Sequence, residues 1–268
     1  MKHRLKQTGS PFDWTAIGIT LLVALFFAAA ISSVLLGGIP YLADALRFPE
    51  IQHAIRLSLL TSLASTSACM LLAMPCAYAL ARLRIPGQRF LQVLIELPLS
   101  LPYLVLGLCL LIVFSSPVGK ALRTAGFPVV FHQNGIVLAQ LFVNLPFAIR
   151  LLRTELESFD PRLEFVAGTL GASRWMRFRT ILLPQCRIAL MTCAILTWSR
   201  AMGEFGATLM LVGVTRMKTE TLPGSIYLSI STGENGMAMA AAIIMLVISS
   251  MALAASSLIS ARFKTDRR

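Results

Sequence analysis

The sequence predicts an all-α integral membrane protein with six transmembrane helices. Three observations predict this fold class. The mean hydropathy of the 268 residues is +0.76, and only 13% of the residues are charged. In addition, uncharged runs recur that are long enough to cross the lipid core, since a spanning helix needs about 20 apolar residues. This composition excludes an ordinary soluble domain. We expect a single transmembrane domain over residues 1–268.

The first span is expected at residues 14–36, after a basic tail at residues 1–13. Ser10 followed by Pro11 is typical of a helix start, and Trp14 stands where aromatic side chains meet the membrane interface. The 23 uncharged residues of this span exceed the apolar core of a secretory signal peptide. We therefore expect the span to be retained rather than cleaved.

A five-helix core is expected between residues 55 and 260. The segment ELPLSLPY, residues 96–103, predicts a broken helix at the start of the third span, because proline cannot donate a hydrogen bond to the preceding turn. Two other spans contain a single proline each, Pro75 and Pro146. The five spans are expected at residues 57–81, 97–119, 134–152, 188–212 and 235–261.

Basic residues predict the orientation of these spans. Cytoplasmic segments of membrane proteins are enriched in Lys and Arg. If the N-terminus is cytoplasmic, the inside segments hold most of the basic residues, including seven arginines between Arg150 and Arg187. We therefore predict that both termini and the loop at residues 153–187 are cytoplasmic. The net charge of +12 reflects this bias, and no basic patch interleaved with aromatic residues favours nucleic acid as a partner.

Cysteine and histidine show no pattern of metal ligands. The five cysteines lie in or beside apolar spans without CxxC spacing, and the three histidines stand singly near span ends. We interpret the cysteines as free, small core residues and expect no metal site.

The loop at residues 153–187 contains a predicted helix, turn and helix. Asp160 and Pro161 are typical of a helix start, and Gly171 of a helix end. A second short helix then precedes the fifth span. The hairpin could lie in the lipid interface or dock onto another protein. The exposed side of its first helix is expected to carry Asp160 and Glu164, and its apolar stripe is made of small to medium residues, which favours docking.

The hairpin resembles the signature loop of permeases from ATP-binding-cassette (ABC) importers of type I, which have the MetI-like architecture. That signature reads EAA, three residues, G, nine residues, I, x, LP. Here Gly171 is followed by nine residues and then by Ile181, Leu182, Leu183 and Pro184. The positions aligned with EAA hold Phe165, Val166 and Ala167, with the acidic residue one place earlier. The residues that the resemblance assigns to this loop are Glu164, Phe165, Val166, Ala167, Gly171, Ala172, Ser173, Ile181, Leu183 and Pro184.

The resemblance implies that the hairpin inserts into a cytoplasmic ATPase and couples ATP hydrolysis to movement of the spans. The sequence has no GxxxxGK[ST] phosphate-binding loop, so ATP would be used by a separate pair of ATPase subunits. The chain itself is then not an enzyme and binds no cofactor. The implied partners are a second copy of the chain in a homodimer, the ATPase dimer, an extracytoplasmic substrate-binding protein and membrane lipid.

The fifth span contains two charged residues, Arg200 and Glu204, in SRAMGEFGATLMLVG. A charged side chain costs about 2.5–3.5 kcal/mol at the centre of an inserting helix, so the two need a reason to be there. They stand four residues apart, within reach of each other on a continuous helix, and could form a pair that only orients it. Alternatively they border the translocation path or its gate, together with Gly203 and Gly206. A ridge of small residues would let a second copy approach closely, at Ser199, Gly203 and Ala207.

Two segments resemble the molybdate, tungstate and sulfate branch of these permeases. One is RAMGEFGAT in the fifth span, and the other is residues 219–234, TETLPGSIYLSISTGE, where we expect a short external helix. The resemblance implies import of a tetrahedral oxyanion, with molybdate or tungstate favoured, across a bacterial plasma (inner) membrane. Alternative cargoes are sulfate or thiosulfate, phosphate, ferric iron or another small solute. An intramembrane enzyme would need a motif such as HExxH or GxSxG, which the sequence lacks, and a structural scaffold would leave the signature spacing unexplained.

Overall fold

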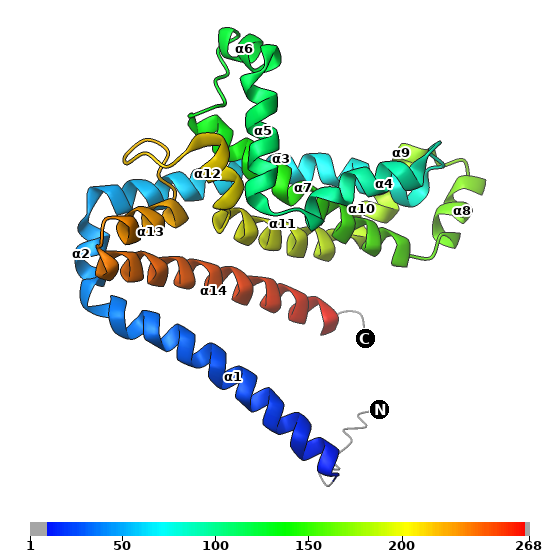
Figure 1. Cartoon of the computed structure of the whole chain (residues 1–268). Coiled ribbons are helices and arrows are strands. Elements are labelled where there is room, and N and C mark those ends of the chain that lie inside the picture. The colour runs from blue at the N-terminus through cyan, green and yellow to red at the C-terminus, as the bar shows by residue number, and fades with distance from the viewer. Residues whose placement is uncertain (1–9, 266–268) are drawn as a thin grey trace.

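A computed structural model describes residues 10–265, with side chains as far as Leu258, and every regular element in this range is helical (Figure 1). Short 3-10 segments (η1, η2) and one π-helical segment (η3) join the α-helices. The elements are α1 (Pro11–Gly38), η1 (Ile39–Tyr41), α2 (Leu42–Arg47), α3 (Pro49–Arg82), α4 (Gln88–Glu96), η2 (Leu97–Ser100), α5 (Tyr103–Ser115), α6 (Pro117–Thr124), α7 (Gln133–Ser158), α8 (Arg162–Thr169), α9 (Arg174–Arg177), η3 (Phe178–Leu182), α10 (Leu183–Gln185), α11 (Arg187–Met202), α12 (Gly206–Val212), α13 (Leu222–Ser231) and α14 (Asn235–Thr265).

Six membrane spans are counted when each bent helix pair is taken as one span. The helices α3, α7 and α14 are long and apolar enough to cross a membrane, and α1 forms a fourth span together with η1 and α2. The other two are bent pairs, residues 88–100 with α5 and residues 174–185 with α11. The number agrees with the sequence-based expectation, although two of the spans are not straight.

The third span, expected over residues 97–119, is broken near its start, as the sequence predicted. The first part ends at Ser100, and α5 begins at Tyr103 with its axis bent by 115°. Pro98 and Pro102 have no N–H group to donate to a continuing helix. The break therefore falls within ELPLSLPY, where the sequence predicted it.

The centre of the fold is a helix pair, α3 and α7, which pack along each other; α11 lies against both, and α14 lies against α11 (Figure 1). Many of the buried residues at this centre are small, which lets helices approach closely in a membrane protein. Those of the α3–α7–α11 core are Cys69, Ala73, Met74, Ala77, Leu80, Ala148, Ile149, Leu152, Leu156 and Cys193.

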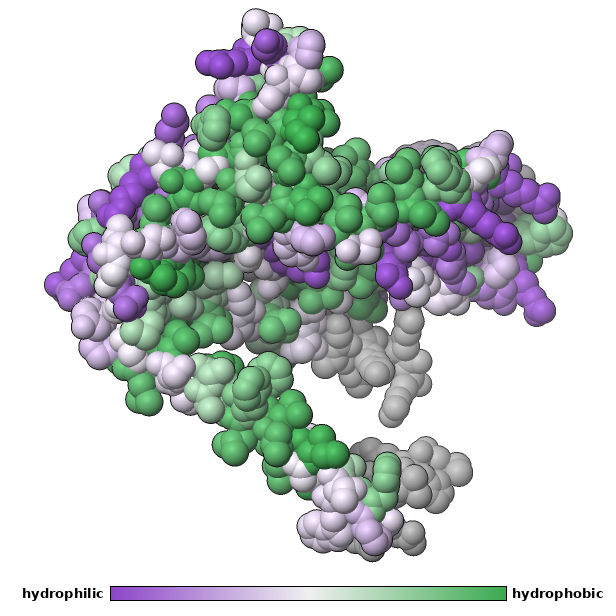
Figure 2. Space-filling view, viewed as in Figure 1, coloured by the Kyte–Doolittle hydropathy of each residue, from purple (hydrophilic) through white to green (hydrophobic). Residues whose placement is uncertain are grey.

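The surface is divided into an apolar middle and polar ends. Figure 2 shows apolar side chains over the middle of the molecule, while hydrophilic residues gather at the end that carries α8 and α9, at the opposite end near α2, and on α6. This distribution fits a protein whose middle contacts lipid hydrocarbon and whose ends contact water or lipid headgroups. Long exposed apolar side chains along α1 agree with it.

The first helix contacts the rest of the chain near its C-terminal end. Its start is as expected, since Ser10 caps the helix and Asp13 completes a capping box. At the other end Gly38 lies so close to α14 that a β-carbon there would be 2.7 Å from the backbone carbon of Met239. From this crossing α1 diverges from α14 (Figure 1), so the first span adds little to the core.

We expect Gly107→Ala to lower the free energy of unfolding by roughly 1–3 kcal/mol, because the added methyl group overpacks the contact between α5 and α12. A β-carbon at position 107 would lie 2.6 Å from the carbonyl oxygen of Ala207. The control is Gly18→Ala in α1, where nothing lies within 4 Å of the new carbon. Thermal unfolding of the purified variants in detergent measures the difference, and equal stability would contradict the close packing.

Candidate functional site

Most of the loop at residues 153–187 folds as the expected helical hairpin. The carboxylate of Asp160 accepts a backbone hydrogen bond at the start of α8. Gly171 follows the helix with a φ of +86°, a left-handed conformation in which glycine is strongly favoured. The hydroxyl of Ser173 then accepts a hydrogen bond from the N–H of Met176 (3.2 Å) and caps α9. Both helices and the glycine turn are therefore confirmed.

Apolar side chains of this hairpin point away from the rest of the chain. The stripe predicted on α8 is exposed rather than packed inside, and Leu170 has 83% of its surface accessible. An exposed group of large apolar side chains on a polar end of the molecule is typical of a surface that binds another protein or a membrane. We call these residues the hairpin surface: Leu163, Phe165, Val166, Leu170, Trp175 and Met176.

Glu164 was expected on the exposed side of α8, but its side chain is largely buried. Its Oε1 lies 2.7 Å from Nε of Arg82, at the end of α3, and each side chain is only 14% exposed. The same arginine donates to the carbonyl oxygen of Phe159 (3.2 Å). Arg177 of α9 donates to the carbonyl oxygen of Glu164 (3.2 Å). The carboxylate therefore ties the hairpin to the second span instead of facing a partner.

The remaining hairpin residues hold it together or join it to the fifth span. Ala172 donates its N–H to the carbonyl oxygen of Ala167 (3.0 Å) across the turn. Ile181 lies in η3, and α10 continues with Leu183, which packs against the α3–α7–α11 core, and Pro184, which is exposed. The axis then bends by 69° into α11. A movement of the hairpin would therefore act directly on the fifth span.

The fifth span is interrupted, and this changes the surroundings of its two charges. The helix expected over residues 188–212 ends at Met202 and resumes at Gly206 as α12. Glu204 lies in the break, is only 3% exposed, and accepts a hydrogen bond from the N–H of Ala207 (2.7 Å). The carboxylate thus satisfies a backbone donor at the start of the new helix.

Arg200 has partners of its own, so the expected pair with Glu204 is not the arrangement observed. Its Nε donates to Oδ1 of Asn144 (3.2 Å) and its Nη2 to the hydroxyl of Tyr103 (3.0 Å). The guanidinium also lies 4.6 Å from the centre of the Phe147 ring. The pairing prediction was wrong because it assumed a continuous helix through residues 200–204.

The small residues of the fifth span are used within the chain. A β-carbon at Gly206 would lie 3.0 Å from Cβ of Tyr103, and one at Gly203 would lie 3.3 Å from the terminal methyl of Met245. Ala207 faces Gly107. The expected flat ridge is therefore divided between α5 and α14 and does not present one continuous surface to a second copy.

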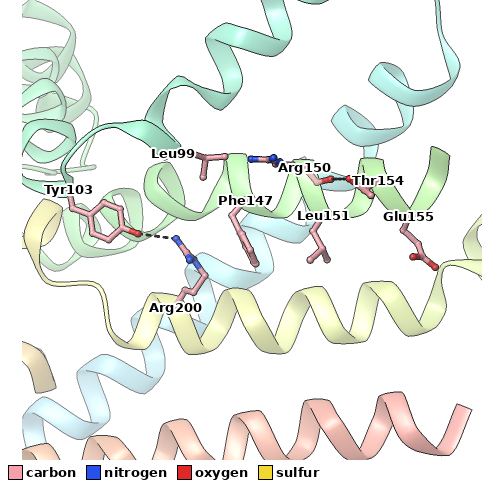
Figure 3. Close-up of a pocket in the computed structure, with 8 residues that line it drawn as sticks. All are labelled: Leu99, Tyr103, Phe147, Arg150, Leu151, Thr154, Glu155 and Arg200. Carbon is pink, nitrogen blue, oxygen red and sulfur yellow. Dashed lines mark hydrogen bonds between the residues drawn. The ribbon is translucent and has the colours of Figure 1, made fainter. Parts of the chain in front are cut away.

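A cavity of about 690 Å³ lies between α7, α11 and the start of α5 (Figure 3). Three of its lining residues are apolar: Leu99, Phe147 and Leu151. The other five carry polar groups: Tyr103, Arg150, Thr154, Glu155 and Arg200. In Figure 3 the hydrogen bond from Arg200 to Tyr103 bridges α11 and the segment that enters α5.

The segment at residues 219–234 also forms the expected helix, α13, which lies between α3 and α14. Leu222 is fully buried, and its N–H donates to the hydroxyl of Ser58 on α3 (2.7 Å). Ile230 is exposed, while Ser229 is buried. The buried face is therefore set partly by small serines that let α13 approach its neighbours.

A sequence profile for "Binding-protein-dependent transport system inner membrane component" matches residues 69–265, which is most of the chain. The chain belongs to this family. It is the membrane-spanning permease component of a transport system rather than an enzyme, and the ATPase of such a system is a separate subunit.

Relatives of this permease include proteins named for oxyanion transport. The molybdate/tungstate transport system permease protein WtpB of Thermococcus kodakarensis is 37% identical over 201 residues, covering 74% of this chain and 76% of that protein. The molybdenum transport system permease protein ModB of Mycobacterium bovis is 34% identical and covers 84% and 90%. The sulfate transport system permease protein CysW of Synechococcus elongatus is 32% identical and covers 96% and 93%.

Solved structures of ABC importers share the fold of this permease. A bacterial alginate ABC transporter in complex with a periplasmic protein matches with a TM-score of 0.77 at 16% identity, covering 94% of this chain and 95% of that chain. The methionine transporter MetNI matches with a TM-score of 0.64 at 16% identity, covering 78% and 94%. At these identities the likeness concerns the fold alone, and it confirms the predicted type I, MetI-like architecture.

The structure brings the predicted hairpin residues together in the permease, whereas Arg200 and Glu204 bind different partners. Sequence reasoning missed Arg82, Tyr103 and Asn144, which hold Glu164 and Arg200. The sequence did contain a signal for Asn144, because a polar amide within an apolar span is costly and usually has a partner. Arg82 gave no such signal, since it reads as one of several basic residues at a cytoplasmic end.

Proposed function

We propose that this permease forms the pore of an ABC importer for a tetrahedral oxyanion, molybdate or tungstate, in the plasma (inner) membrane of a bacterium. The observation that best supports molybdate or tungstate as the cargo is the 37% identity over 201 residues to a permease named for molybdate and tungstate transport. Within this proposal the chain binds no cofactor and no metal of its own, and ATP is bound and hydrolysed by the partner ATPase.

The hairpin surface is the proposed contact with the ATPase. It combines a rigid glycine turn with six exposed apolar side chains, and Arg82 and η3 connect it to the second and fifth spans. Two ATPase subunits would require two hairpins, so we propose a homodimer of the permease. When the ATPases approach each other, the two hairpins would move and shift the pore between its outward-open and inward-open states.

The proposed orientation has both termini in the cytoplasm. The basic residues of the hairpin region support it, since positive charge is enriched on the cytoplasmic side. The end near α2, together with α6 and the 213–221 loop, would then lie on the side of the substrate-binding protein outside the membrane. Labelling of single cysteines introduced at Arg174 and Lys120 by an impermeant reagent tests this: in intact cells only position 120 should react.

We expect deletion of the gene to abolish high-affinity molybdate uptake by the native cells. The measurement is uptake of radiolabelled molybdate at low concentration, with and without the gene, and with tungstate or sulfate as competitors. Strong competition by tungstate and weak competition by sulfate would support the proposed cargo. Unchanged uptake in the deletion strain would contradict it.

Sulfate is the second candidate cargo. It is favoured by one observation, namely that the sulfate relative of Synechococcus elongatus aligns with 96% of this chain, against 74% for the molybdate/tungstate relative. Uptake of radiolabelled sulfate in the same two strains distinguishes the cargoes. Loss of sulfate uptake with normal molybdate uptake would favour this second candidate.

A further inference from the structure

The cavity in Figure 3 lies where two of the spans are broken. The third span bends just before Tyr103, at the start of α5, and the fifth span is interrupted two residues after Arg200. Irregular backbone within a membrane is tolerated where it is buried in protein or lines a water-filled space. The residues on both sides of the break in the third span, Leu99 and Tyr103, and the last turn of α11 before the break in the fifth span line one cavity, which supports a hydrated space within the permease rather than a gap filled by lipid.

The side chains in direct contact with the guanidinium of Arg200 carry no charge. Asn144, Tyr103 and Phe147 contribute an amide oxygen, a hydroxyl and an aromatic ring, all of them uncharged. Among the ion pairs of the described residues, none involves Arg200 or Arg150. Glu155 is the one carboxylate that lines the cavity. The lining therefore has two cationic groups and one anionic group, and the buried carboxylate of Glu204, four residues from Arg200, is not part of it.

Hydrogen bonds fix the position of the Arg200 guanidinium but use only some of its N–H donors. Asn144 donates to the carbonyl oxygen of Gln140 (2.8 Å), and Gln140 donates to the carbonyl oxygen of Ala201 (2.9 Å). Both amide side chains are about 1% exposed. A guanidinium has five N–H donors, and two are used in these contacts. Arg200 lines the cavity, and a buried network fixes the orientation of its guanidinium, which keeps three further N–H donors.

We propose that this cavity is a transient binding site for the transported oxyanion within the pore. The inference rests on the proposed function. Arg200 supplies the positive charge and N–H donors, the Tyr103 hydroxyl supplies a further polar contact, and Arg150 is the next cation along the cavity. The volume of about 690 Å³ equals that of roughly twenty water molecules. The anion would therefore pass with much of its hydration shell, which suits weak binding and release.

The same tetrahedral oxyanion chemistry occurs in phospholipid headgroups, so the test must separate a transported anion from a lipid. The probe is the rate of modification of Thr154→Cys by a thiol-specific reagent, read at that position by mass spectrometry. The sample is the complete complex, in lipid-free detergent and in vesicles of zwitterionic or anionic lipid. Radiolabelled molybdate and sulfate uptake by the wild-type complex in vesicles first shows which anion is carried.

We expect the carried anion to slow modification of position 154 several-fold in detergent and in both kinds of vesicle, and Arg200→Gln to remove this protection. Arg200→Gln should also lower uptake roughly tenfold or more while ATP hydrolysis stimulated by the binding protein stays within about twofold, because a charge-assisted contact to the anion is lost. Arg200→Lys, which keeps the charge, should lose less. The matched control is Arg89→Gln, an exposed arginine on α4 outside the cavity, which should leave both readouts unchanged.

Protection that survives Arg200→Gln, or that the carried anion does not produce, would overturn the site while leaving the importer function intact. Protection produced by anionic vesicles alone would assign the cavity to a lipid headgroup and would also overturn it. If the wild-type complex takes up neither molybdate nor sulfate, the proposed cargo fails, and the pore site for that cargo fails with it.

Discussion

Replacing Gly171 by leucine is expected to lower transport at least about tenfold while the permease still assembles with its ATPase. The glycine turns the hairpin with a φ of +86°, and a side chain in this left-handed conformation costs about 1–2 kcal/mol. That cost would shift the hairpin toward conformations in which the exposed residues of α8 and α9 no longer form one surface. Transport and ATP hydrolysis by the reconstituted complex should therefore become uncoupled.

Two control variants isolate the backbone conformation as the cause. Gly171→Asn should retain most of the transport, because asparagine tolerates the left-handed region better than other residues. Gly126→Leu places the same side chain at a φ of +87°, in the loop between α6 and α7, and nothing lies within 4 Å of the added carbon at either position. Equal losses in Gly171→Leu and Gly126→Leu would contradict a specific role for the hairpin turn.

The local features that the sequence predicted best are those set by one residue type. Pro98 and Pro102 break a helix wherever they occur, Gly171 accepts a positive φ, and Ser10 caps the helix that follows. The lengths of the uncharged runs similarly predicted the number of spans. These properties depend on the chain's own covalent chemistry, so they could be predicted without knowledge of the tertiary contacts.

The predictions that failed concern which of several possible partners a charged side chain binds. Spacing placed Arg200 and Glu204 within reach on an ideal helix, but Glu204 instead accepts a hydrogen bond from a backbone N–H in the break between α11 and α12. Glu164 was expected to face outward, yet it binds Arg82, which lies 82 positions earlier. Contacts over such separations follow from how α3, α7 and α11 pack, and periodicity within one helix carries no information about them.

Breaking the contact between Arg82 and Glu164 is expected to impair coupling as strongly as the Gly171 variant. Glu164→Gln keeps the shape of the side chain but removes its charge from a pair that is 2.7 Å apart and largely buried. A hydrogen bond to a charged group is worth roughly 1.5–3 kcal/mol, and here the unpaired arginine stays behind. The hairpin would then detach from the end of α3, and transport per ATP hydrolysed should fall about tenfold or more.

A double-mutant cycle separates this pair from general damage to the fold. Arg82→Gln and Glu164→Gln should each reduce coupling and stability, whereas the double variant should lose less than the sum of both, because no unpaired charge remains. The matched control is Glu157→Gln, which removes the exposed partner of an i, i+4 pair with Arg153 on α7. A surface pair of this kind contributes about 0.3–0.5 kcal/mol, so that variant should transport normally. Strictly additive effects at Arg82 and Glu164 would mean that the hairpin reaches the spans through η3 and α10 alone.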